Sequence, residues 1–172
     1  GTESLMMIFI GLEVMSISLY VLCGMARERA TGMEAALKYF LLGAFSTGFL
    51  VYGTALVMGA TGSLHLPKIA EAIRAGTEGG LHLPMLMAGV AMIIVALAFK
   101  VAAVPFHFWL PQAHPIAPTV LSAFLSGVII KMGIYGILRT YLFIKPVPEW
   151  AGWFILIISI ISAIFGVWYA LA

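Results

Sequence analysis

The run MLMAGVAMIIVALAFKVAAVPFHFWLP, residues 85–111, decides the fold. Residues 85–104 carry a single charge, Lys100, and at 1.5 Å per residue they are long enough to cross about 30 Å of hydrocarbon as a helix. Pro105 should end that helix, because proline has no backbone N–H and its ring clashes with the preceding turn. A charge near the centre of a membrane helix costs about 2.5–3.5 kcal/mol. Lys100, placed beside a helix break, is therefore the first candidate for a functional residue.

Further apolar runs surround this stretch and predict an all-α, polytopic membrane protein of about five transmembrane helices, with the chain as a single membrane domain. The expected spans are residues 5–25, 35–58, 85–104, 119–143 and 150–172. Residues 64–74 alternate apolar and charged side chains at helical spacing, so they predict a short amphipathic helix. That helix either lies in the membrane interface or packs on other subunits. Prolines 105, 111 and 118 predict a broken helix followed by an irregular segment.

Composition supports a bilayer as the solvent and excludes several functional classes. The hydrophobic fraction is 63%, and the charged fraction of 9% is far below the roughly 25% of soluble domains. The four histidines and one cysteine show no metal-ligand spacing, and no phosphate loop, nucleophile triad or haem motif is found. We therefore expect no metal and no cofactor in this chain. A net charge of +2 gives no reason to expect nucleic acid as a partner.

Two other charges lie deep in apolar runs. Lys131 lies near the middle of the span 119–143 and shares a helix face with Gly127 and Tyr135, which favours a helix facing the bundle interior. The alternative is a structural lysine tied to a neighbouring subunit. Glu13 lies in the middle of the first span, and its expected partner is Lys38 near the start of the second. That pair is either a structural ion pair or a switch, because buried lysines and glutamates change protonation readily.

Further polar side chains surround the predicted break. His107 and His114 lie at its two ends, and histidine titrates near neutral pH, which suits a proton relay. The alternative is a histidine that only hydrogen-bonds a loop carbonyl. Ser122 and Ser126 precede Lys131 in the next span and could extend a polar stripe toward it.

The residues also carry a resemblance to a known family. The string Phe99-Lys100, then Val104-Pro105-Phe106-His107-Phe108-Trp109-Leu110-Pro111, then Ala117-Pro118-Thr119 and Lys131, resembles the antiporter-like subunits of respiratory complex I. It is equally similar to their relatives in membrane-bound hydrogenases and multisubunit sodium/proton antiporters. The stretches Ile10-Gly11-Leu12-Glu13 and 34–43 look most like the N type of subunit. Ala113-His114-Pro115 and 131–139 look more like the M and hydrogenase types.

This resemblance implies a subunit of about fourteen helices with two inverted five-helix repeats, of which this chain would supply a fragment covering about helices five to nine. Glu13, Lys100 and Lys131 would match the family's buried glutamate and its two lysines. The implied function is proton translocation by charge coupling in a redox-driven assembly of the NADH:quinone oxidoreductase or hydrogenase type, with no redox chemistry in this chain. The rivals are a purely structural membrane subunit and a Na⁺/H⁺ antiporter subunit. Expected partners are other membrane subunits, the lipid bilayer and protons or Na⁺, in a bacterial or archaeal plasma membrane.

Overall fold

The structure is a computed structural model that describes residues 3–25, 30–114, 119–143 and 149–171. Its long helices are α1 (Leu5–Cys23), α2 (Ala30–Thr61), α4 (Leu83–Val101), α7 (Ile130–Phe143) and α8 (Glu149–Leu171). Shorter elements are α3 (Leu66–Ala75), the 3₁₀ turns Thr77–Gly79 and Phe106–Trp109, α5 (Leu110–Ala113), α6 (Thr119–Phe124) and the π-helical segment Leu125–Ile129. The described residues contain no strand beyond one isolated bridge between Ser4 and His65. The predicted all-α fold is confirmed.

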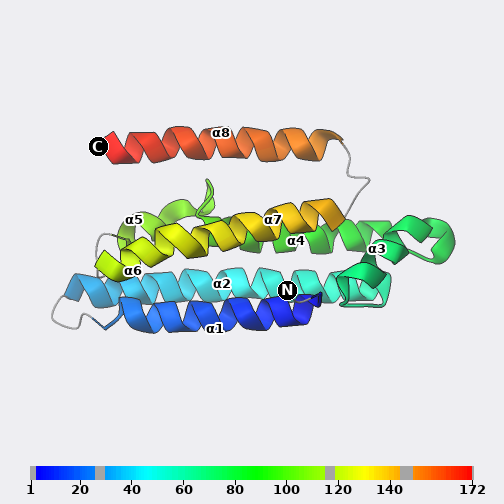
Figure 1. Cartoon of the computed structure of the whole chain (residues 1–172), viewed down its shortest axis with the longest axis horizontal. Helices are drawn as coiled ribbons and strands as arrows, with labels where there is room; N and C mark the ends of the chain where they lie inside the picture. Colours follow the sequence, from blue (N-terminus) through cyan, green and yellow to red (C-terminus); the bar gives the residue numbers. More distant parts are fainter. Residues whose placement is uncertain (1–2, 26–29, 115–118, 144–148, 172) are drawn as a thin grey trace.

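Four segments are long and apolar enough to cross a membrane, namely Leu5–Cys23, Gly32–Thr61, Leu83–Trp109 and Ser122–Leu142. A fifth, shorter apolar stretch, Ile155–Tyr169, lies within α8. The long helices α1, α2, α4 and α7 run antiparallel in succession and pack side by side, and α8 runs along the outer side of this group (Figure 1). The chain is a polytopic membrane protein of the kind that the sequence predicts.

The tightest helix contact joins α2 to α4. A Cβ added to Gly53 would lie 2.7 Å from the carbonyl oxygen of Gly89, and one added to Gly89 would lie 2.8 Å from that of Gly53. The two backbones therefore touch at a point where only glycine fits. Because lipid is as apolar as leucine, membrane helices associate through such close van der Waals packing rather than through the hydrophobic effect. Gly133 plays a similar part between α7 and α4, where its Cβ would meet Val101 at 2.7 Å.

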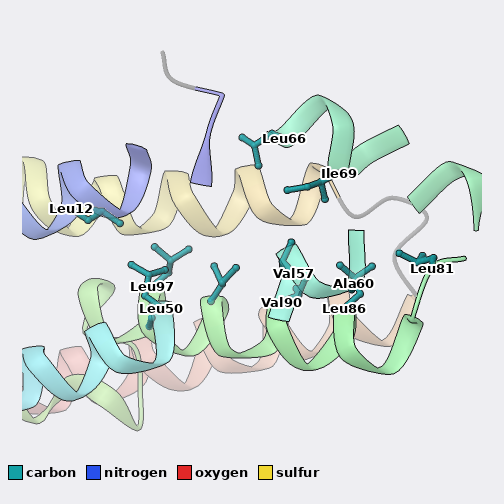
Figure 2. Close-up of a cluster of buried hydrophobic side chains, with 12 residues drawn as sticks. Leu12, Leu50, Val57, Ala60, Leu66, Ile69, Leu81, Leu86, Val90 and Leu97 are labelled. Carbon is teal, nitrogen blue, oxygen red and sulfur yellow. The ribbon is translucent and has the colours of Figure 1, made fainter. Parts of the chain in front are cut away.

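One apolar cluster joins the ends of α2 and α4 to the amphipathic helix α3. Figure 2 shows side chains from α1, α2, α3 and α4 gathered in this cluster, with Leu66 and Ile69 contributed by α3. Lys68, Glu71 and Arg74 lie on the exposed side of the same helix. The apolar side of α3 thus packs on the chain's own helices.

The break differs from its prediction in two details. Helix α4 ends at Val101, three residues before the predicted end at 104, because Ala102 adopts a left-handed conformation with φ of 56°. Pro111 does not break a helix, since it occupies the first turn of α5, where a missing N–H costs nothing. Pro105 lies between α4 and the 3₁₀ turn as predicted, and Pro118 falls outside the described residues.

Candidate functional site

Lys100 is the buried charge at the centre of the site. Its side chain is only 4% exposed, and its Nζ donates a hydrogen bond of 2.5 Å to Oγ of Ser16 on α1. The Ser16 hydroxyl in turn donates to the carbonyl oxygen of Leu12 at 2.6 Å. The side chain of Lys100 therefore ends inside the group of helices rather than at its surface. Its ammonium is held between two helices by a hydroxyl that is itself fixed in orientation.

Glu13 lies one turn before Ser16 on the same helix. Its carboxylate accepts a hydrogen bond of 2.8 Å from Oγ1 of Thr47 on α2. The predicted partner, Lys38, instead forms an exposed ion pair of 2.6 Å with Glu34 on its own helix. The predicted Glu13–Lys38 pair is therefore wrong. Nine residues separate Lys38 from Thr47, about 13 Å along α2, so a carboxylate that reaches Thr47 is too far along the helix to pair with Lys38.

Two of the carbonyls at the end of α4, those of Ala98 and Phe99, accept hydrogen bonds from the turn that follows. The N–H of Ala102 donates to Phe99 at 3.0 Å and the N–H of Ala103 donates to Ala98 at 2.9 Å, which is the Schellman pattern of a helix C-terminus. The indole Nε1 of Trp109 donates to the carbonyl of Phe99 as well, at 2.8 Å. The backbone N–H of Val104 donates to Oγ of Ser162 on α8 at 3.0 Å. Side chains distant in sequence thus complete the broken backbone.

An aromatic cluster supports the break from the α2 side. Trp109 is 1% exposed and stacks on Tyr39 with ring centroids 4.5 Å apart, and Tyr39 meets the edge of Tyr20 at 4.7 Å. Sequence reasoning placed Trp109 only near a span end, where membrane proteins carry an aromatic belt, and assigned no role to Tyr39. The available signal was a tryptophan, a side chain with one N–H donor, four residues after a helix-ending proline, where free carbonyls need donors.

The histidines lie at the two ends of the break, as the sequence suggested, but their contacts differ. The ring of His107 stacks on Phe108 at 4.8 Å and meets Phe165 and Tyr169 of α8 at 5.8 and 5.7 Å. Its buried Nδ1 has no hydrogen-bond partner within the described part of the chain. His114 ends α5, and its Nδ1 lies 2.7 Å from Oγ of Ser122 on α6. This second contact links the two sides of the segment 115–118.

Lys131 occupies a very different place from Lys100. It is an exposed residue that lines a cavity of about 610 Å³ between α1, α2, α3, α4 and α7. Gly127 and Tyr135 line the same cavity, so the predicted shared face is observed. The Tyr135 hydroxyl accepts a hydrogen bond of 2.8 Å from Arg139, while Ser126 bonds the carbonyl of its own helix at Ala123.

The helix that carries Lys131 is itself irregular. The π-helical segment Leu125–Ile129 directly precedes α7, so the turn before Lys131 is wound more loosely than an α-helix. Such single π turns leave a carbonyl without its usual partner and recur at functional sites. Within the described residues, no group of three or more His, Cys, Asp or Glu side chains could hold a metal ion.

Comparison of the sequence with known families finds one match. The family described as NADH:quinone oxidoreductase/Mrp antiporter, TM, matches residues 2–172. The NADH-quinone oxidoreductase subunit N of Mycobacterium tuberculosis is 44% identical over 154 residues, which are 89% of this chain and 28% of that protein. Subunit N of Gemmatimonas aurantiaca is 49% identical over 129 residues, which are 75% of this chain and 24% of that protein. The chain thus spans less than a third of the length of these relatives.

Solved structures of related membrane complexes are also similar to this chain. Respiratory complex I from Thermus thermophilus contains a chain that is 37% identical, with a TM-score of 0.66, over 81% of this chain and 29% of its own length. The archaeal membrane-bound sulfane sulfur reductase gives a TM-score of 0.78 at 28% identity, over 91% and 31%. The Mrp complex from Dietzia gives 0.71 at 30% identity, over 83% and 26%. The family match over residues 2–172 and the shared membrane fold lead to one conclusion: this chain belongs to the NADH:quinone oxidoreductase/Mrp antiporter transmembrane family.

Proposed function

We propose that this chain carries one proton site of an N-type, antiporter-like subunit in a redox-driven membrane complex. The observation that carries the proposal is Lys100, a lysine that is 4% exposed and held at a helix break by Ser16. The relatives named subunit N support the assignment of the subunit type. The solved neighbours are multisubunit membrane complexes, which supports other membrane subunits as partners.

The proposed mechanism is electrostatic coupling between helices α1 and α4. Glu13 lies one turn before Ser16, the residue that Lys100 contacts, although no ion pair joins Glu13 to Lys100 within the described residues. At an effective dielectric near 20, two unit charges 4 Å apart interact by about 4 kcal/mol, and the interaction weakens in proportion as they separate. A movement of α1 that brings Glu13 nearer would hold the proton on Lys100, and a movement away would release it.

The proton then needs a destination. Lys131, which lines the cavity between α1, α2, α3, α4 and α7, is the next cationic group that we propose for the path. His107, in the turn after Pro105, remains a candidate relay. His114, whose ring lies within hydrogen-bond distance of Ser122 on α6, remains a second candidate. Lys38, Ser126 and Tyr135 remain candidates for outer positions. In this scheme the chain moves protons and performs no redox chemistry.

The test is proton uptake per quinone reduced in the assembled parent complex whose full-length subunit carries Lys100→Met. We expect the complex to assemble and the proton yield to fall. Lys68→Met is the matched control, because Lys68 is an exposed lysine on α3, and it should leave the yield unchanged. An unchanged yield per assembled complex with Lys100→Met would favour a purely structural role for the buried charge. A yield that depends on added Na⁺ would favour a sodium/proton antiporter.

A second variant keeps the test decisive if Lys100→Met fails to assemble. Ser16→Ala retains the charge of Lys100 and removes only the hydroxyl that accepts from it. Ser18→Ala is its control, because the exposed Ser18 hydroxyl donates to the carbonyl of Val14 on its own helix. We expect Ser16→Ala alone to lower the proton yield. Equal yields in the two serine variants would contradict the assignment of Lys100 to the proton path.

A further inference from the structure

The break in α4 removes two helical hydrogen bonds at Lys100 and the residue after it. In a continuous helix the N–H of Val104 would donate to the carbonyl of Lys100, and the residue at 105 would donate to the carbonyl of Val101. Proline at 105 makes the second bond impossible. The first bond remains chemically possible, because Val104 keeps its N–H. Since the left-handed Ala102 already ends α4 at Val101, the Val104 donor needs a partner elsewhere, and that partner determines where the segment after the break lies.

Ser162 on α8 is that partner. The N–H of Val104 donates to Oγ of Ser162 at 3.0 Å, across 58 residues of sequence. Backbone donors at membrane depth cannot turn to water, so a lost partner must be replaced by another protein group. The bond to Ser162 satisfies this donor and at the same time ties the segment after the break to α8.

The Val104–Ser162 hydrogen bond is one of several contacts between α8 and the residues of the break. Residues 162, 165 and 169 follow one another at helical spacings of three and four, so they share one face of α8. Phe165 and Tyr169 meet the ring of His107, three residues after Val104. Ser159, by contrast, is exposed and bonds the carbonyl of Ile155 on its own helix. Only one of these two α8 serines reaches the break.

We propose that Ser162 is a positioning residue for Lys100: it binds the Val104 donor and so holds the segment after the break, and with it the end of α4, in place. The inference rests on the proposed proton-carrying function of Lys100. Ser162 itself does not carry the proton, since its described contact is with a backbone amide. It acts by fixing the direction in which the end of α4, and with it the Lys100 side chain, leaves the helix.

The experiment compares Ser162→Ala with Ser159→Ala in the full-length subunit of the assembled complex. The readouts are the amount of assembled complex, the quinone reduction rate and the protons taken up per quinone between pH 6 and 9. Loss of one neutral hydrogen bond changes the ratio of two conformations by about fivefold. We therefore expect Ser162→Ala to lower the proton yield and change its pH profile, with Ser159→Ala matching the wild type. Ser162→Thr keeps the hydroxyl and should restore the yield.

A double variant separates this inference from the proposed function. If Ser162 acts through Lys100, adding Ser162→Ala to Lys100→Met should cause no further loss of proton yield, because interacting residues are not additive. A further loss in the double variant would overturn the inference. So would a Ser162→Ala variant with normal yield and pH profile, whether or not less complex assembles. In either case the effect of Lys100→Met alone would still decide the proposed function.

Discussion

Lys100 and Lys131 lie in neighbouring helices of one small bundle, yet their burial and their contacts are opposite. Lys100 is buried, bonded to Ser16 and surrounded by backbone that is pinned by Trp109 and Ser162. Lys131 is exposed, lines a cavity of about 610 Å³ and follows a π-helical turn. The difference teaches that one lysine is held in a fixed position by its neighbours, whereas the other has room to move.

The largest expected effect comes from enlarging each lysine to arginine. Lys100→Arg must fit a planar guanidinium where an ammonium meets Ser16, and such overpacking costs about 1–3 kcal/mol. Lys131→Arg points into a cavity and should cost little. The measurement is the thermal midpoint of the purified complex. Proton yield does not separate the two variants, because arginine retains its proton at either site.

Lys68→Arg on the exposed side of α3 serves as the control and should behave as the wild type does. Equal midpoints for the Lys100 and Lys131 variants would show that the two sites do not differ in the space they offer. A lower midpoint for Lys131→Arg alone would reverse the comparison. It would mean that in the assembled complex another helix fills the cavity around Lys131.

The second prediction concerns the contact that fixes the helix of Lys100. Gly53→Ala would place a methyl carbon 2.7 Å from the backbone oxygen of Gly89, so α2 and α4 must separate. Gly48→Ala on the same helix meets nothing within 4 Å among the described residues. We expect opposite signs: Gly53→Ala should lower the thermal midpoint, whereas Gly48→Ala should raise it slightly, since alanine is better than glycine in a helix by about 1 kcal/mol.

The comparison also shows how far sequence reasoning reaches. The fold class follows from the apolar runs, and the break follows from Pro105, because both depend on local chemistry alone. The shared face of Gly127, Lys131 and Tyr135 was also predictable, because helical spacing determines it. These features need no knowledge of which helices are neighbours.

Features that depend on helix register were not predictable. Glu13 was paired with Lys38 because their charges are opposite, but the register of α1 on α2 brings Thr47 to the carboxylate and leaves Lys38 with Glu34. Ser16, Trp109 and Ser162 are ordinary residues in the sequence, and each gains its role from a partner ten or more residues away. The left-handed Ala102 was hidden for a different reason, since the usual marker of that conformation is glycine.

The smallest expected effect, and the most local, comes from that alanine. Ala102 has φ of 56° and ψ of 38° at the end of α4, where a Cβ crowds the following carbonyl oxygen and costs roughly 1–2 kcal/mol. Ala102→Gly removes this strain but adds freedom to the unfolded chain, which offsets roughly 0.5–1 kcal/mol. We therefore expect a small rise in the thermal midpoint. Ala98→Gly, inside the same helix, should lower the thermal midpoint, because a glycine inside a helix costs about 1 kcal/mol of folding free energy.

Ala102→Gly also tests what fixes the position of Lys100. If the left-handed turn is fixed by the hydrogen bonds from Ala102 and Ala103 to α4, relieving its strain should leave the proton yield unchanged. A stabilised complex with a reduced yield would instead mean that the strain itself helps to set the position of Lys100. Strained residues do cluster at functional sites, and they persist only where the surrounding structure holds them. The proton yield of Ala102→Gly, measured beside that of Ser162→Ala, therefore shows whether the break is held in place by its own backbone or by α8.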